Sequence, residues 1–342
     1  MHKKTQFAAI GVVGALFALA GCTSPPAAAP SEGANGDLVC EPMSLAGLDD
    51  DSHRAAFWAL ENDLVTSDAI PSITVSYLQI PALIQATGAS EYDVIMTSLP
   101  GVVLANERGG LDLRIAALSL AHSGGGLSLY GKKDSGIETA ADLAGKTVAT
   151  PSFGSTGTQE AQMVLAEKYG LDFALEGGDI TWVELDPPTI LNALEKGDID
   201  AGLLWHQAGW LADRNPEMKK IAQLDVEFKE IANGAWPIGA AFVVQGEYVD
   251  ANLECVNEFQ DMLEESVEYA KNNVTEFSQE LAAQTGVPAE FIEFWWEPEN
   301  YMFGGVVNDE WVGYAREFYE LAAEYGSIPV NPDLDKLIIP RG

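Results

Sequence analysis

The chain has 342 residues, with 18 lysines and arginines against 52 aspartates and glutamates, so its formal net charge at pH 7 is −34. Nucleic acid is excluded as an expected partner, because phosphate binding needs clustered basic side chains. Adhesion to an anionic membrane through a basic face is disfavoured for the same reason. Hydrophobic residues make up 47% of the chain, which predicts one large or two medium folded domains and not disorder.

Residues 1–21 have the features of a secretory leader. Two lysines precede the apolar run Phe7–Ala20, which is too short to span a bilayer as a helix. The run ends in Leu-Ala-Gly-Cys at residues 19–22, the lipobox pattern of bacterial lipoproteins. We therefore predict a signal peptide over residues 1–21, lipid attachment at Cys22, and a flexible tether over 22–37, which is rich in Pro, Ala, Gly and Ser. An ordinary signal peptide is the alternative.

This leader places the mature protein on the outer face of the cytoplasmic membrane, where only the lipid touches the bilayer. Removal of Lys3 and Lys4 takes away two positive charges and changes the formal charge from −34 to −36. We interpret this acidity as a solvated exterior. Cys40 and Cys255 remain, and an even pair in an oxidising compartment predicts one disulfide. Two buried free thiols are the alternative.

Two stretches of the sequence superpose at a constant offset. The first begins at Ile73 and the second at Ile180, which gives an offset of 107 residues (180 − 73). Each copy is typical of a buried strand, a short helix that starts with proline, a turn, and a second strand. Two ordinary βαβ units that resemble each other by chance are the alternative. As a true repeat, the pattern predicts two α/β lobes with mostly parallel strands and helices on both faces.

The segments around the repeat predict how the lobes are joined. A strand over Leu113–Ser119 is followed by a glycine-rich segment, 122–126, and by the strand-like run Leu127–Tyr130. A later run, Ile238–Gln245, is strand-like too, and helical patterns follow it. We expect these two runs to pair as a two-stranded hinge and the C-terminal helices to pack on the first lobe. The expected lobes are residues 38–122 plus 243–342 (lobe I) and 123–242 (lobe II).

Three motifs follow one another in lobe II: Asp-Leu-Ala-Gly-Lys-Thr-Val-Ala at 142–149, Gly-Ser-Thr-Gly at 154–157, and Leu-Glu-Lys-Gly-Asp-Ile-Asp-Ala at 194–201. This succession resembles the nitrate, sulfonate, taurine and thiamine-precursor family of ABC-importer substrate-binding proteins, over roughly residues 38–325. The resemblance implies a two-lobed, type II periplasmic-binding-protein-like fold. It also implies closure on a small-molecule ligand and delivery to an ABC permease and its ATPase. We expect a monomer without a cofactor.

The chain departs from this family at two ligand-side places. The first strand, residues 39–44, is a poor match, and where relatives often have Trp-Glu-Pro this sequence has Trp205-His206-Gln207. By resemblance we expect an organosulfonate, a taurine-like compound or another small oxyanion. A hydroxymethylpyrimidine-like heterocycle is the alternative ligand, because Trp205 can cover a flat ring.

The offset also predicts which loops face each other across the cleft, because ligands bind at the carboxyl ends of parallel strands. The segment Gly154–Thr158 opens a helix, and its N–H groups and hydroxyls suit a small anion; a plain helix cap is the alternative. Trp205 leaves a buried strand at the same edge. The candidate ligand-binding residues are Ser52, His53, Gln79, Thr97, Ser98, His122, Gly154, Ser155, Thr156, Asp186, Trp205 and His206.

All three mature histidines, His53, His122 and His206, fall on predicted cleft or hinge loops. A three-histidine metal site is one interpretation. None of the three has a close ligand spacing such as HxxxH, so we expect hydrogen bonds to the ligand and no metal. The acidic run Asp49–Asp51 is typical of a solvated helix start; as a cleft feature it would favour a cationic or neutral ligand.

An enzyme is the main alternative class of function, because an enzyme of thiamine-precursor synthesis shares this general fold. The sequence contains no GxSxG elbow, no HExxH motif and no dinucleotide-binding glycine pattern after the first strand. We therefore expect no catalysis. A ligand sensor that presents the same two lobes to a partner protein is the second alternative.

Overall fold

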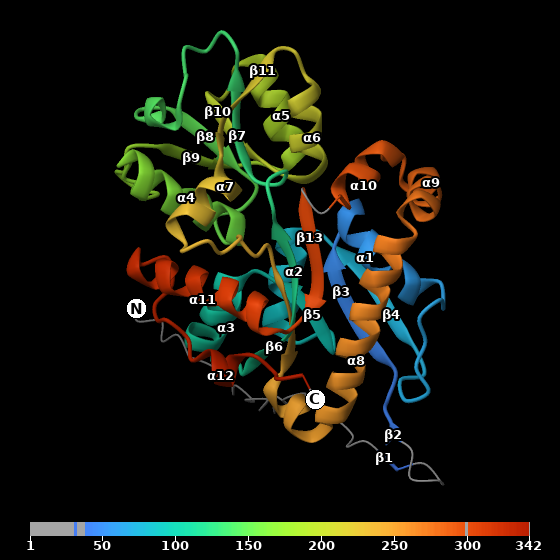
Figure 1. Ribbon diagram of the computed structural model, residues 1–342. Coiled ribbons are helices and arrows are strands. Elements are labelled where there is room, and N and C mark those ends of the chain that lie inside the picture. Colours follow the sequence, from blue (N-terminus) through green and yellow to red (C-terminus); the bar gives the residue numbers. More distant parts are fainter. Residues whose placement is uncertain (1–30, 33–37, 298–299, 342) are drawn as a thin grey trace, which may run out of the picture.

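The computed structural model describes residues 31–32, 38–297 and 300–341. The predicted signal peptide and Cys22 lie outside the described residues. Two β-sheets form two lobes, with lobe II above lobe I in Figure 1. Near the start of the described chain, β1 (Ser31–Glu32) and β2 (Leu38–Val39) pair as a short antiparallel ladder.

Lobe I contains a six-stranded sheet and lobe II a five-stranded sheet. The lobe I strands, in spatial order, are β13 (Tyr301–Val306), β6 (Leu113–His122), β12 (Ala241–Gln245), β5 (Val94–Thr97), β3 (Met43–Leu48) and β4 (Ile73–Leu78). The lobe II strands, in spatial order, are β11 (Met218–Gln223), β7 (Ser128–Lys132), β10 (Ala201–Leu204), β8 (Thr147–Thr150) and β9 (Thr181–Glu184). We propose residues 38–122 plus 243–342 as lobe I and residues 123–242 as lobe II. Strand β12 of the lobe I sheet begins at Ala241, two residues before this boundary.

Only part of each sheet is parallel, so the expectation of mostly parallel strands is wrong. The strands β4, β3 and β5 are parallel neighbours, as are β9, β8 and β10. Every other described pairing between two named strands of these sheets is antiparallel. The reason is the way the chain enters each lobe. Both β7 and β12 begin at the cleft, where the parallel strands end, and so they run in the opposite direction.

The repeat is present in the structure at the offset found in the sequence. The helices α2 (Ile80–Ala89) and α5 (Pro187–Lys196) lie 107 residues apart (187 − 80 and 196 − 89). Both have proline in the first turn, and both end at a left-handed residue, Ser90 and Gly197. The flanking strands β5 and β10 lie at the same offset (201 − 94). Lobe II therefore repeats the strand–helix–strand unit of lobe I.

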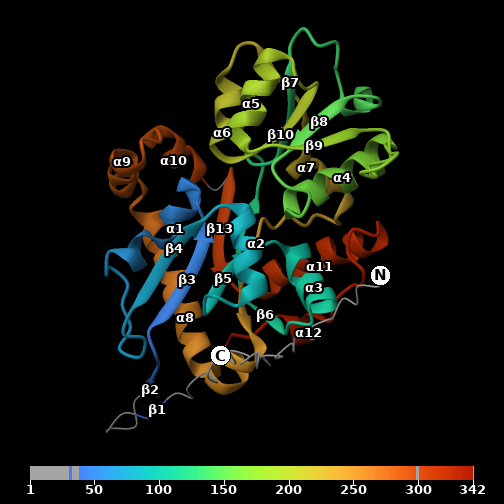
Figure 2. The same ribbon diagram turned by 180° about the vertical axis from the view of Figure 1, so that it is seen from behind.

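Helices cover both faces of each sheet, as the two opposite views show (Figures 1 and 2). The lobe I helices are α1 (Asp51–Glu61), α2, α3 (Leu99–Gly109), α8 (Gly246–Asn272, interrupted at Asn252), α9 (Val274–Thr285), α10 (Ala289–Trp295), α11 (Asp309–Glu324) and α12 (Leu334–Leu337). The lobe II helices are the 3₁₀ turn η1 (Ala140–Leu143), α4 (Thr156–Tyr169), α5, α6 (His206–Arg214) and α7 (Leu224–Ile231). In the described part of the chain, no helix combines the length and the apolar character needed to cross a bilayer.

The C-terminal helices pack on lobe I, as expected. Helix α8 lies against α1 and β13, and α12 lies against β6. Cys255 on α8 forms a disulfide with Cys40, which precedes β3 and lies 215 residues away in sequence. The covalent link therefore ties the first strand of lobe I to the chain that returns from lobe II.

The two lobes are connected at residues 123–127 and 232–240, and their pairing differs from the expected hinge. Ala121 and Ile238 form an antiparallel bridge, and the His122 N–H donates to the Pro237 carbonyl at 2.9 Å. Beyond this bridge, β12 pairs with β5 and β6, not with Leu127–Tyr130. The expected pairing is wrong because β7 already has β10 on one side and β11 on the other.

Asp225 holds the glycine-rich crossover in place. Its buried carboxylate, in the first turn of α7, accepts hydrogen bonds from the N–H groups of Gly124 and Gly126, both at 3.0 Å. Between them, a Cβ added at Gly125 would lie 2.9 Å from the Cα of Asn300, so only glycine fits there. Asp225 was not a candidate in the sequence analysis, because an acidic residue in a first helical turn is common everywhere.

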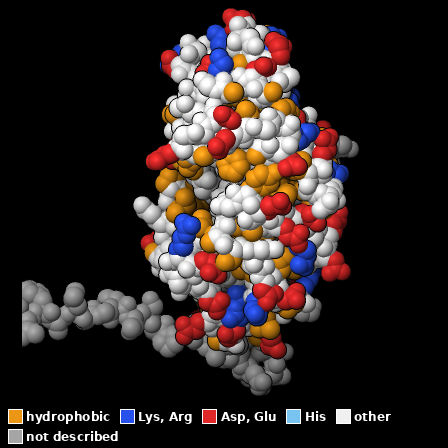
Figure 3. All heavy atoms as spheres, turned by 90° about the vertical axis from the view of Figure 1, so that its left-hand side faces the viewer, with side chains coloured by type: hydrophobic (Ala, Val, Ile, Leu, Met, Phe, Trp, Pro, Cys, Tyr) orange, Lys and Arg blue, Asp and Glu red, His pale blue; other side chains and the backbone are white. Residues whose placement is uncertain are grey.

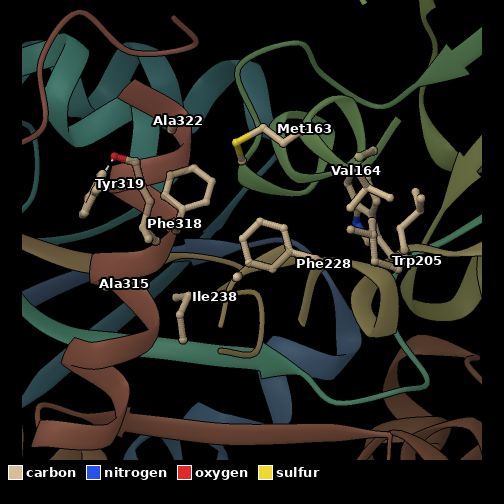
Figure 4. Packing of buried hydrophobic residues seen from close by; sticks show 14 of the residues in the cluster. Met163, Val164, Trp205, Phe228, Ile238, Ala315, Phe318, Tyr319 and Ala322 are labelled. Atoms are coloured by element: carbon tan, nitrogen blue, oxygen red, sulfur yellow. Dashed lines mark hydrogen bonds between the residues drawn. The ribbon is translucent and has the colours of Figure 1, made fainter. Parts of the chain in front are cut away.

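A continuous hydrophobic cluster joins the two lobes. Phe228, just before the second crossing segment, and Ile238, within it, lie in one cluster with Phe318 of α11 and with Val164 and Trp205 of lobe II (Figure 4). Helix α11 of lobe I also contacts α4 of lobe II. The structure is therefore a closed arrangement in which both lobes contribute to a shared core.

Candidate functional site

A cavity of about 110 Å³ lies between the lobes. Its apolar lining comes from Leu48, Ile80, Leu83, Ile84, Met96, Leu120, Ala240 and Trp205. Its polar and glycine lining comes from His53, Thr97, Ser98, His122, Gly154, Ser155, Thr156, Gly157, His206 and Gly239. Nine of the twelve candidate residues, all except Ser52, Gln79 and Asp186, line this one cavity. It has an apolar wall and a polar end, as small-molecule sites commonly do.

The amino ends of five helices converge on the cavity. His53, Ile80 and Thr156 lie in the first turns of α1, α2 and α4, and His206 is the first residue of α6. Ser98 is the N-cap of α3. Helix amino ends carry partial positive charge and unsatisfied N–H donors. The helix starts therefore contribute positive potential at the polar end of the cavity, where no lysine or arginine is among the described lining residues.

Polar groups of the two lobes bond directly to each other at this cavity. The Ser98 hydroxyl donates to the Gly154 carbonyl at 2.8 Å, and the Leu99 N–H donates to the Thr156 hydroxyl oxygen at 3.1 Å. These bonds join the start of α3 to the start of α4. Because each bond has one partner in each lobe, separation of the lobes must break both.

The segment Gly154–Thr158 acts as a helix cap and also faces the cavity. The Ser155 side chain accepts a hydrogen bond from the Thr158 N–H at 3.2 Å and donates to the Ser152 carbonyl at 3.0 Å. The segment therefore caps α4 and lines the cavity at the same time. A Cβ at Gly157 would lie 3.6 Å from the Trp205 ring, so the absence of a side chain lets the indole lie against the helix start.

Three candidate residues do not contribute to the described cavity lining. Gln79 donates to the Asp49 carboxylate at 3.1 Å. Asp186 accepts from the Thr189 hydroxyl at 2.9 Å within the first turn of α5. These described hydrogen bonds of Gln79 and Asp186 therefore stay within their own lobes. The Ser52 side chain lies outside the described part of the chain.

His53 and His206 converge on the carboxylate of Asp50. The Nδ1 atom of His206 lies 2.9 Å from one oxygen of Asp50, and the Nδ1 atom of His53 lies 3.5 Å from the other. Asp50 and His53 belong to lobe I and His206 to lobe II, so this cluster also spans the cleft. His122 stands beside it, with its ring centroid 6.4 Å from that of His206.

The geometry at His206 is unusual for a residue with a side chain. Its φ of +54° lies in the left-handed region, which costs a non-glycine residue on the order of 1 kcal/mol. The edge-on ring of Trp295 packs against the imidazole with centroids 4.4 Å apart. Trp295 is fully buried, and its contact with the cavity histidine was not predicted.

Burial and the neighbouring charges set the protonation of the cluster. Burial lowers the pKa of His53 and, more strongly, that of His122. Burial works against the charged form of Asp50, but the imidazoles of His206 and His53 outweigh it and hold the pKa of Asp50 well below its usual range. At neutral pH the cluster beside the cavity therefore contains the ionised carboxylate of Asp50, and the imidazoles of His53 and His122 are neutral.

Acidic side chains are spread over the surface, and apolar side chains gather where the lobes meet. Figure 3 shows this distribution on one face, with red side chains more frequent than blue on both lobes and orange side chains around the waist. The acidity predicted to be a solvated exterior is visible on that face.

One carboxylate of lobe II is fully buried. Both oxygens of Glu160, on α4, lack a hydrogen-bond partner among the described residues. Burial, with a contribution from the charge of Asp225, raises the pKa of Glu160 well above its usual value. A carboxyl group whose pKa is raised in the folded state contributes its full stabilisation below the ordinary glutamate pKa of about 4.3, and this stabilisation is lost as the pH rises from there through the folded-state pKa.

Replacing Glu160 with glutamine removes this pH dependence. We expect the difference in unfolding free energy between Glu160→Gln and the wild type to grow in favour of the variant as the pH rises above the ordinary glutamate pKa of about 4.3, by up to about 1.4 kcal/mol per pH unit. Urea unfolding at several pH values measures it. Glu247→Gln, at an exposed position on α8, is the control and should show no such trend. A pH-independent difference for Glu160→Gln would contradict the expectation.

Comparison with known proteins places this fold among binding proteins. Residues 77–276 match the model of the family described as NMT1/THI5 like. A putative binding protein from Brucella abortus is 27% identical over 139 residues, which are 40% of this chain and 40% of that protein's length. The periplasmic aliphatic sulphonate binding protein SsuA from Escherichia coli is 17% identical, with a TM-score of 0.68 over 89% of this chain and 93% of that one.

A second solved structure has the same fold. The alkanesulfonate-binding protein SsuA from Xanthomonas axonopodis pv. citri, solved with MOPS bound, is 17% identical with a TM-score of 0.68, and the match covers 88% of this chain and 99% of that one. These likenesses confirm the two-lobed periplasmic-binding-protein fold. Since the family model covers more than half of the residues, the chain belongs to the NMT1/THI5-like family.

Proposed function

We propose that this protein is the substrate-binding component of an ABC importer and that it captures a small molecule by closure of its two lobes. The observation that carries the proposal is the cavity between the lobes, where both contribute lining residues and bond to each other through Ser98, Thr156 and their neighbours. A binding protein that opens and closes needs such contacts on both sides of one ligand.

The proposed context follows from the leader. Attachment through Cys22 would keep the protein on the outer face of the cytoplasmic membrane, beside an ABC permease and its ATPase, and it would act there as a monomer. Catalysis is not part of the proposal. The similarity to binding proteins of import systems supports this context, and so do the helix starts, which suit reversible binding of a polar group.

For the ligand we propose a small organosulfonate or a similar oxyanion. Five helix amino ends face the polar end of the cavity, and they can stabilise a negative group without a basic side chain. The apolar wall with Trp205 would cover the organic part of the ligand. The sulfonate-binding proteins with the same fold support this choice. A pyrimidine-like heterocycle is the second candidate, favoured by the absence of lysine and arginine from the described lining.

A thermal-shift and calorimetry panel tests the ligand class. The panel contains alkanesulfonates, taurine, nitrate, pyrimidines and aromatic carboxylates. We expect an alkanesulfonate or taurine to raise the unfolding free energy by about 2.7 kcal/mol at a concentration one hundred times its Kd. Stabilisation by pyrimidines alone would establish the second candidate, and no stabilisation by any compound would contradict capture itself. Uptake of the bound compound by cells with and without the gene then tests the transport role.

A further inference from the structure

The cluster around Asp50 has the composition and the spacing of a metal site. Two imidazole nitrogens face the two oxygens of one carboxylate at 2.9 and 3.5 Å, and one ligand atom from each of the three residues lies within 4.8 Å of the others. In a tetrahedral zinc site with bonds of about 2.0–2.1 Å, neighbouring ligand atoms lie about 3.3 Å apart. The two nitrogen–oxygen distances lie within about half an ångström of this value, and a separation as wide as 4.8 Å would have to shorten by about 1.5 Å, so side-chain rotation would place all three around one ion.

The surroundings of the cluster fix its side chains. The His53 and His206 side chains are 4% and 8% exposed, and that of Asp50 is 22% exposed. Trp295 packs edge-on against His206, and Phe303 lies edge-on to His53 with ring centroids 6.3 Å apart. Metal sites need ligands that are held in place by such packing. The left-handed backbone at His206 is a second sign that the position of this side chain is maintained at a cost in stability.

We propose that Asp50, His53 and His206 bind one divalent transition-metal ion of the zinc class, and that this ion bridges the two lobes. Two histidines and one carboxylate form a three-ligand set, which leaves a further coordination position open. Since His53 and His206 both line the cavity, that position faces the bound ligand. Sequence reasoning rejected a metal because the histidines lie far apart in the chain; the fold brings two of them together across the cleft.

A metal ion would also compensate the negative charge of Asp50 beside the cavity. This point rests on the proposed function, in which the ligand is an anion. The carboxylate of Asp50 would repel an anionic ligand, and the cavity has no lysine or arginine among its described lining residues. An ion of charge +2 would reverse this local charge and offer a coordination position to an oxyanion. The three metal-binding side chains all come from the protein, and so metal binding can be measured without an organic ligand.

Metal titration of the tag-free, chelator-treated protein tests the proposal with the ion alone. We expect calorimetry to give one Zn²⁺ per chain, and Co²⁺ to give the visible absorption of a tetrahedral site. Each of Asp50→Asn, His53→Gln and His206→Gln should weaken Zn²⁺ binding by more than about 100-fold, because even the outer partners of metal ligands contribute roughly 10–100-fold. Circular dichroism of each metal-free variant checks that it is folded.

Asp49→Asn is the matched control. Asp49 is the adjacent acidic residue and pairs with Arg54 at 2.6 Å, outside the proposed ligand set, so its loss should leave Zn²⁺ affinity unchanged within about threefold, a difference of less than 1 kcal/mol. The proposal is overturned if the wild type binds no Zn²⁺, or if the three folded variants bind it as tightly as the wild type does. Failure of this titration leaves the sulfonate panel unaffected, since that panel is scored on organic compounds.

Discussion

Replacing Trp205 with alanine is expected to weaken binding of the best compound in the panel by about 30-fold or more, which corresponds to the 2 kcal/mol typical of a binding hot spot. The indole forms part of the cavity wall and lies against Gly157 at the start of α4. Its removal exposes the organic part of the ligand to water and widens the cavity. Trp205→Phe keeps an aromatic ring there and should retain most of the affinity. Isothermal titration calorimetry measures both variants.

Trp236→Ala provides the matched control for this experiment. Trp236 is a half-buried tryptophan on the second crossing segment and packs against Lys229, but it does not line the cavity. We expect its replacement to leave affinity nearly unchanged. Equal losses for the two tryptophans, or no loss for Trp205→Ala, would contradict the assignment of the cavity as the ligand site.

Loss of the Cys40–Cys255 disulfide is expected to lower the free energy of unfolding by about 2–5 kcal/mol. The bond closes a loop of 215 residues, and a long loop restricts the unfolded chain strongly: the chain-entropy model gives about 5 kcal/mol for this length. The link joins the entry to β3 with α8, and so its loss also frees the start of lobe I. Urea unfolding with and without reductant measures the change.

The double variant Cys40→Ala/Cys255→Ala separates the bond from the reductant. It should be less stable than the oxidised wild type, and reductant should not change its unfolding curve. Superimposable curves for oxidised and fully reduced wild type, with reduction checked by a thiol assay, would contradict the expected contribution of the bond.

Local patterns in the sequence were sufficient for the repeated core of each lobe. The strand–helix–strand units from Ile73 and Ile180 have hydrophobic runs, helix-starting prolines and turn signals, and their structures follow these signals closely. The hinge pairing was not predictable in the same way. Strand partners depend on which sheet edge is free, and β7 obtains both of its partners inside lobe II.

The candidate site was predictable where it depends on strand ends and not where it depends on contacts between distant residues. Ser98 and Trp205 follow strands of the repeat, and Thr156 follows the neighbouring strand β8, and so their common edge follows from the α/β design. The approach of His206 to Asp50 requires the closed arrangement of the lobes, which no spacing along the chain encodes. Asp225 was missed for the same reason, because its partners lie about one hundred residues earlier, at separations of 99 and 101.

Small-angle X-ray scattering with and without a bound sulfonate tests the central claim, that the lobes close on a ligand, most directly. The account predicts that the free protein has the larger radius of gyration, and that saturation with ligand yields the curve calculated from the closed structure. Scattering curves that superimpose with and without a ligand proven to bind would contradict capture by lobe closure.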